Sequence, residues 1–152
     1  MISNFGSSLI GTVSHGQHLH RNRQGLTKRL IRVHMASMIA TILSALVALL
    51  HAYFLYLEMF AWEQPRTRAA FGTTADFAKA SKTLAANQGL YNGFLAAGIA
   101  FSLWAADRPA LIFCLVSVIV AGIYGAASAS RRILFVQALP AALALAATLL
   151  SI

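Results

Sequence analysis

The sequence predicts an all-α fold, a four-helix transmembrane bundle preceded by a basic N-terminal tail. Of the 152 residues, 59% are hydrophobic and 11% are charged, roughly half the charged fraction of an ordinary soluble domain. Four apolar segments follow one another, separated by polar turns, and their lengths are typical of membrane-spanning helices. We place the spans at about residues 35–60, 84–105, 110–127 and 133–152.

Residues 1–34 differ from the rest of the chain. They are rich in Gly, Ser and Asn, and they contain four of the five histidines together with several Lys and Arg. We predict a disordered or weakly ordered basic extension. The histidines of residues 15–20 allow a metal-binding interpretation, but a disordered tail with incidental histidines explains them better. Met35 is a candidate for the native start, which would make residues 1–34 an upstream extension.

The first span contains small residues at four-residue spacing, a pattern that lets another helix approach closely. These residues are Ala36, Ala40, Ser44, Ala48 and Ala52. His51 and Glu58 lie seven residues apart in the same span. At that spacing they share a helix face, about 10 Å apart along the axis.

Residues 61–83 form the one substantial loop. Within it, Thr73 or Thr74 is expected to cap a short polar helix that runs directly into the second span. That span begins with three carboxamides, a tyrosine and two glycines in a G-x-x-x-G pattern. The string is Asn87-Gln88-Gly89-Leu90-Tyr91-Asn92-Gly93.

The third and fourth spans contain prolines and glycines with distinct expected roles. Pro109 suits the first turn of the third span, and Pro140 is expected to kink the fourth. Glycines let helix backbones approach one another, so we predict that the glycines of the second and third spans are packing contacts. They are Gly89, Gly93, Gly122 and Gly125.

The chain order places nearly all the intramembrane polar groups at the same depth, on the side of loops 61–83 and 128–132. Polar side chains in hydrocarbon tend to face the bundle interior, so we predict a polar pocket there. The predicted pocket residues are His51, Glu58, Asn87, Gln88, Tyr91, Asn92 and Tyr124. For Asn87, which lies nearest the membrane interface, the alternative role is to form a hydrogen bond that holds two helices together.

The basic residues outside the tail are distributed unequally between the two sides. Six are on the side of loops 61–83 and 128–132, and Arg108 is alone on the other. The positive-inside rule therefore predicts that both loops are cytoplasmic and that the protein is integral to the cell (inner) membrane. Counting residues 1–34 would equalise the two sides, so this orientation depends on Met35. The net charge of +8 lies in the tail and loops, which indicates lipid headgroups and not nucleic acid as the partner.

Several strings are similar to one known family of small membrane proteins, the domain of unknown function 1304 family. They are Leu55-Tyr-Leu-Glu58-Met-Phe-Ala-Trp62, Pro65-Arg66, Phe71-Gly72, the string 87–93, and Val120-Ala-Gly122-Ile-Tyr124-Gly125. The resemblance covers about residues 35–152 and implies a bacterial or fungal integral membrane protein with four spans, starting near Met35. Leu50 departs from the family pattern, in which Glu often precedes the histidine, and this weakens a mechanism with two carboxylates. The family name records no activity.

Three functions fit these residues. The leading hypothesis is binding or transport of a small amphipathic or cationic compound, with Glu58 as a proton-coupled acceptor. In architecture such a protein resembles the small multidrug exporters, and it would need a homodimer to enclose a binding site. The alternatives are an intramembrane enzyme, in which His51 and Glu58 relay a proton on a lipid-like substrate, and a non-catalytic scaffold. A non-enzymatic role is favoured.

Neither a cofactor nor a metal is expected. His51 and Glu58 lack a third metal ligand of good type, and no motif for nucleophilic catalysis or phosphate binding appears. The single cysteine, Cys114, lies inside an apolar segment and is expected to be a packing residue. The identity of the small-molecule ligand stays open.

Overall fold

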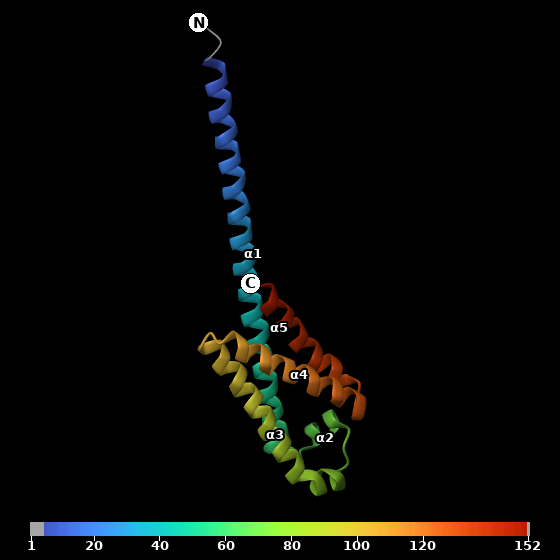
Figure 1. Ribbon diagram of the computed structural model, residues 1–152. Helices are drawn as coiled ribbons and strands as arrows, with labels where there is room; N and C mark the ends of the chain where they lie inside the picture. Colours follow the sequence, from blue (N-terminus) through green and yellow to red (C-terminus); the bar gives the residue numbers. More distant parts are fainter. Residues whose placement is uncertain (1–4, 152) are drawn as a thin grey trace.

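The described part of the chain is all-α and contains no strand (Figure 1). The computed structural model describes the backbone of residues 5–151 and the side chains of residues 23–151. Its elements in chain order are α1 (Phe5–Met59), α2 (Pro65–Phe71), α3 (Ala75–Trp104), α4 (Arg108–Ser128), the π turn η1 (Leu134–Ala138) and α5 (Leu139–Leu150). The predicted all-α class is therefore confirmed.

The C-terminal half of α1 forms a bundle with α3, α4 and α5 (Figure 1). α1 packs against α3 and α5, and α4 packs against the same two helices. All four helices contribute to a small apolar core, whose buried members are Val47, Ile99, Leu111, Leu115, Val118, Ala141 and Ala144. The alanines come from α5, where small side chains allow close approach of the helices.

One narrow stripe of α1 faces the interior of this bundle. Its buried residues are Ala40, Ser44, Val47, His51, Leu57 and Glu58. All but Leu57 are spaced three, four or seven residues apart, the period of a helix that packs along a single seam. Leu46 and Leu49 on the other faces of the helix are exposed. The inner stripe therefore contains three polar residues, whereas the outer faces are apolar.

The N-terminal part of α1 extends away from the bundle (Figure 1). The sequence predicts a disordered or weakly ordered extension over residues 1–34, and the backbone of the structure is helical from Phe5 onward. No proline interrupts residues 5–59, but four glycines between residues 6 and 25 lower the helix propensity of this segment. Residues 23–32 are all exposed, which leaves this segment without the tertiary packing that normally stabilises a helix. Residues 1–4 and the side chains of the histidine-containing stretch 15–20 lie outside the described residues. The domain boundary near residue 35 stays a prediction.

Two segments are long and apolar enough to cross a membrane by length and composition. They are Arg23–Met59, whose most apolar 18-residue stretch has a mean hydropathy of 2.1, and Arg108–Ser128, where the corresponding value is 2.4. The other two predicted spans do not meet this criterion. The amides near the start of α3 lower its hydropathy, and the apolar segment Leu134–Leu150 is shorter than a typical spanning helix. The structure therefore supports four packed helices, with two of them as candidate membrane spans.

The residues predicted to begin the second and third bundle helices occupy those positions in the structure. Thr74 caps α3 by accepting a hydrogen bond from the backbone N–H of Phe77 at 3.2 Å, and α3 then continues unbroken to Trp104. Pro109 lies in the first turn of α4, as expected. The predicted irregularity at Pro140 takes the form of the π turn that precedes it. A proline lacks an N–H and crowds the carbonyl four residues earlier, which disfavours regular α-helix there.

Candidate functional site

A carboxylate and a carboxamide meet in the interior, between α1 and α3. Glu58 and Asn92 are only 8% and 7% exposed, and Asn92 Nδ2 donates a hydrogen bond to Glu58 Oε2 at 2.7 Å. Among the described residues, no Lys or Arg approaches the Glu58 carboxylate closely enough to form an ion pair. A buried carboxyl group with only a neutral partner is unusual, because buried charges are normally paired.

His51 lies two turns from Glu58 on the same inner stripe and is fully buried. Its Nδ1 is 2.9 Å from the backbone carbonyl of Val47, one turn earlier in the same helix. A carbonyl oxygen only accepts, so this contact places the ring hydrogen on Nδ1 and leaves a lone pair on Nε2. Nε2 has no hydrogen-bond partner among the described residues. The imidazole therefore bonds to its own helix and not to a neighbouring one.

The other predicted pocket residues do not join this site. Asn87 and Gln88 are exposed, and the side chains of Tyr91 and Tyr124 belong to residues that are 58% and 73% exposed. The reason is the rotation of α3 about its axis. Asn92 lies on the stripe that faces α1, and Asn87 and Tyr91 lie on other faces of the helix. Gln88, one turn before Asn92, is close to the same face but is exposed at its edge. Of the residues from three helices that were predicted to line a polar pocket, the structure thus brings together Glu58 and Asn92, with His51 on the same stripe of α1.

Four glycines predicted as packing contacts lie where a Cβ would meet a neighbour. A Cβ on Gly89 would lie 3.1 Å from both Glu58 Cβ and the backbone nitrogen of Met59, and one on Gly93 would lie 3.3 Å from the Leu55 side chain. The close approach at Gly89 is what brings Asn92, one turn further along α3, within reach of Glu58. Both glycines therefore help to assemble the site.

The second pair of glycines joins α4 to the segment around the π turn. A Cβ on Gly122 would lie 2.9 Å from both the backbone nitrogen and the Cβ of Ala138. A Cβ on Gly125 would lie 3.2 Å from side-chain atoms of Ile133. The first contact involves rigid backbone and the second a flexible side chain, so the two positions differ in how well they tolerate a larger residue.

Three further polar residues are buried in the bundle: Ser44, Ser102 and Thr148. Ser102 and Thr148 donate to carbonyls one turn earlier in their own helices, at 2.7 and 2.8 Å. Ser44 Oγ has no partner among the described residues. Ser44 lies seven residues before His51, as His51 lies seven before Glu58. That spacing was a sequence signal for one polar stripe, but Ser44 was interpreted only as a small packing residue.

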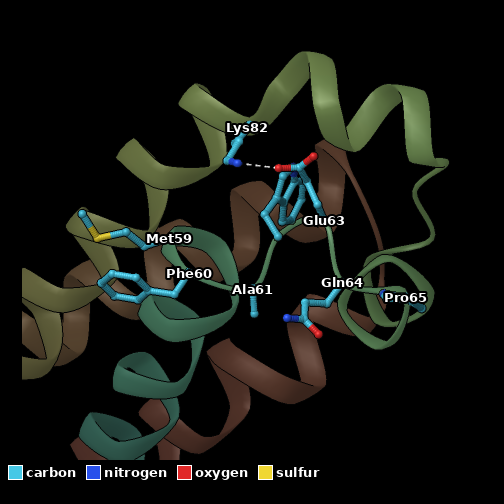
Figure 2. Close-up of a pocket in the computed structure, with 8 residues that line it drawn as sticks. Met59, Phe60, Ala61, Glu63, Gln64, Pro65 and Lys82 are labelled. Atoms are coloured by element: carbon cyan, nitrogen blue, oxygen red, sulfur yellow. Dashed lines mark ion pairs between the residues drawn. The ribbon is translucent and has the colours of Figure 1, made fainter.

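A pocket lies beside the C-terminal end of α1 and not at the predicted position (Figure 2). Its volume is about 350 Å³, and it is lined by residues Met59 to Pro65 and by Lys82 of α3. Lys82 Nζ lies 2.5 Å from Glu63 Oε1 at the pocket edge. The hydrogen bond and charge of Lys82 hold the pKa of the Glu63 carboxyl group below its ordinary value.

The loop that forms this pocket is held against α3. Trp62 Nε1 donates to Ser81 Oγ at 3.1 Å, and the Trp62 ring packs edge-on against Phe71 of α2, with centroids 5.0 Å apart. Gly72 ends α2 in the left-handed conformation, with φ of 68°, and turns the chain toward α3. These contacts bring Glu63 and Lys82 together from separate elements. The sequence analysis placed a loop with a short polar helix at residues 61–83 and predicted no pocket there.

Residues 45–149 match the family described as protein of unknown function (DUF1304). The chain belongs to this family. The matched range includes every residue of the site and the pocket, and it confirms the resemblance found in the sequence. The chain is also similar to the uncharacterized protein YpaA of Lactococcus lactis subsp. lactis (strain IL1403), with 32% identity over 113 residues, which cover 72% of this chain and 95% of YpaA. No solved structure matches the chain.

Proposed function

We propose that this chain is an integral membrane protein of the cell membrane, with loops 61–83 and 128–132 in the cytoplasm. The main support is the distribution of polarity in the bundle. The buried set includes Ser44, His51, Glu58, Asn92, Ser102 and Thr148, and the exposed set includes Leu46, Leu49, Phe94, Phe101, Phe113, Val120 and Leu143. An apolar outer surface around buried polar side chains is unusual for a soluble bundle and suits helices surrounded by lipid.

Within this bundle, Glu58 is the proton-coupled acceptor for a small cationic or amphipathic compound. The observation that carries this proposal is the burial of its carboxyl group against Asn92, with no cationic side chain in contact among the described residues. A buried carboxylate is costly unless a proton or a cation neutralises it. Binding of a cation and binding of a proton at Glu58 therefore compete, which is the basis of proton-coupled exchange.

The relay proposed for an enzyme receives less support from the geometry. His51 and Glu58 share the inner stripe of α1, but they are about 10 Å apart along the helix axis. No hydrogen bond between described residues links the two side chains, and His51 Nε2 has no partner there. One observation supports the scaffold alternative: the Glu58–Asn92 hydrogen bond joins α1 to α3 and could serve only to hold them together. Transport and scaffold functions predict different outcomes for a substitution at Glu58.

The test uses the full chain in liposomes that contain a pH-sensitive dye, with ethidium as an amphipathic cationic probe. We expect ethidium uptake to be accompanied by proton movement in the opposite direction, and Glu58→Gln to abolish this coupling. Gln keeps the shape of the side chain and a hydrogen bond to Asn92 but cannot exchange a proton. The control is Asp76→Asn, which removes an exposed carboxylate in the first turn of α3.

Two results would overturn the proposal. The first is unchanged proton coupling in Glu58→Gln, which would leave the Glu58–Asn92 bond as a purely structural contact. The second is the absence of ethidium-linked proton movement with the unmodified protein. Cross-linking in the same liposomes tests the homodimer, which would supply the larger enclosed volume that transport needs.

A further inference from the structure

Two opposite charges stand at the edge of the pocket beside α1, on elements that the fold brings together. Glu63 comes from the loop after α1 and Lys82 from α3, and their side chains are 44% and 64% exposed (Figure 2). An ion pair with that exposure contributes at most about 1 kcal/mol, because water competes for both groups. A ligand that offers each charge a new partner can therefore separate them at little cost.

The remainder of the lining is mixed in character. Met59, Phe60, Ala61 and Trp62 supply apolar surface, and Gln64 and Pro65 lie on the other side of the charged pair (Figure 2). Phe60 is largely exposed, whereas the Trp62 indole is fixed by Ser81 and Phe71. A volume of about 350 Å³ lies at the small end of the usual range for ligand sites. The pocket therefore suits a small polar group attached to an apolar body.

We propose that this pocket binds a phosphate–ammonium zwitterion, the chemistry of a phosphatidylethanolamine headgroup. Lys82 pairs with the phosphate and Glu63 accepts hydrogen bonds from the primary ammonium, so the ligand replaces the direct ion pair with two charge-assisted contacts. The apolar lining contacts the start of the acyl chains. The lipid source rests on the membrane location proposed above, since the pocket directly follows the last turn of a candidate span.

The charge arrangement discriminates among headgroups. Phosphatidylglycerol has a phosphate but no cation, so it would bring a negative charge toward Glu63 without compensating it. Phosphatidylcholine has a cation, but a quaternary ammonium has no N–H to donate to the Glu63 carboxylate. Phosphatidylethanolamine satisfies both charged side chains. The pocket is therefore expected to prefer a primary ammonium over both alternatives.

The experiment uses the full chain with Trp104→Phe, which leaves Trp62 as the only tryptophan and as a reporter inside the pocket. The detergent-solubilised protein is titrated with each of the three phospholipids and, separately, with soluble phosphoethanolamine. We expect a saturable change in Trp62 fluorescence with phosphatidylethanolamine and affinity about tenfold weaker for the other two lipids. A response to soluble phosphoethanolamine as well identifies a free phosphate compound as a second source of the same chemistry.

Variants of the two charged residues test the assignment. Glu63→Gln and Lys82→Gln are each expected to weaken phosphatidylethanolamine binding about tenfold. The charge-swapped double variant, Glu63→Lys with Lys82→Glu, is expected to recover binding, because a zwitterion can bind in the reverse direction. Lys79→Gln, one turn earlier on α3 and outside the pocket lining, is the matched control.

The proposal is overturned if the three headgroups bind equally, if Lys79→Gln weakens binding as much as Lys82→Gln, or if Glu63→Gln and Lys82→Gln bind normally. It is also overturned if both single variants bind weakly and the folded charge-swapped variant does not recover binding. Glu58→Gln removes the proposed proton acceptor in the bundle and should leave the Trp62 response to lipid intact. Loss of proton coupling and loss of headgroup binding are therefore separate results, and either proposal can fail alone.

Discussion

The hydrogen bond between Glu58 and Asn92 allows a quantitative test of how α1 and α3 are held together. The perturbations are Glu58→Leu, Asn92→Leu and the double variant. Each single substitution removes one partner of a 2.7 Å bond and leaves the other partner buried. The double variant removes both polar groups and puts two apolar side chains of similar size at the helix contact.

The expected magnitudes follow from this burial. A buried group that loses its hydrogen-bond partner typically costs about 1–3 kcal/mol, whereas the replacement of both partners by apolar groups is nearly neutral. The double variant should therefore be more stable than the sum of the single changes predicts. Contacting residues show interaction energies of about 0.5–3 kcal/mol, and hydrogen bonds between membrane helices lie in the lower part of that range.

The measurement is equilibrium unfolding of the full chain in mixed micelles with increasing sodium dodecyl sulfate, followed by far-ultraviolet circular dichroism. The control cycle combines Glu58→Leu with Asn87→Leu, since Asn87 is an exposed asparagine of the same helix that does not face α1. We expect that control to be additive within about 0.5 kcal/mol. An Asn92 cycle that is equally additive would show that the bond does not stabilise the bundle.

Two further predictions concern packing and charge. Gly122→Ala should destabilise the bundle by about 1–3 kcal/mol and Gly125→Ala by less, because the first Cβ meets backbone and the second a flexible side chain. The same unfolding assay measures both variants. A larger loss of stability for Gly125→Ala than for Gly122→Ala would contradict the packing described here. The pKa of Glu63 is lowered by Lys82, so the pair stabilises the loop above the ordinary glutamate pKa and loses this contribution as the pH falls through the lowered value. Carboxyl carbon NMR should give a Glu63 midpoint that Lys82→Gln raises, and equal midpoints in the two proteins would show that no ion pair forms in solution.

The local features of the fold were predictable from the sequence because they depend on neighbouring residues. Thr74 begins a helix since its hydroxyl can cap the backbone, and Pro109 belongs in a first turn since it has no N–H to offer. The packing role of Gly89 followed from the G-x-x-x-G spacing of Gly89 and Gly93 in the sequence. The seven-residue interval between His51 and Glu58 likewise placed both residues on the same face of α1.

The membership of the site depended on which face of α3 turns toward α1. Asn87, Gln88, Tyr91 and Asn92 are close in sequence, and the string alone favours none of them over the others as a partner of Glu58. Only Asn92 points inward, because successive residues are rotated by about 100° and the close approach at Gly89 sets the rotation of the whole helix.

The sequence by itself determined an all-α protein with a polar stripe on an otherwise apolar helix, because hydropathy and helical periodicity are properties of local composition. Only the tertiary structure decided that Glu58 bonds to Asn92, that His51 bonds to its own helix, and that Glu63 meets Lys82 beside a pocket. The Glu58–Asn92 and Glu63–Lys82 contacts join residues that are distant in sequence. For His51, several partners were equally compatible with the sequence. The contacts exist because the helices pack in one particular rotation and the loop folds back onto α3.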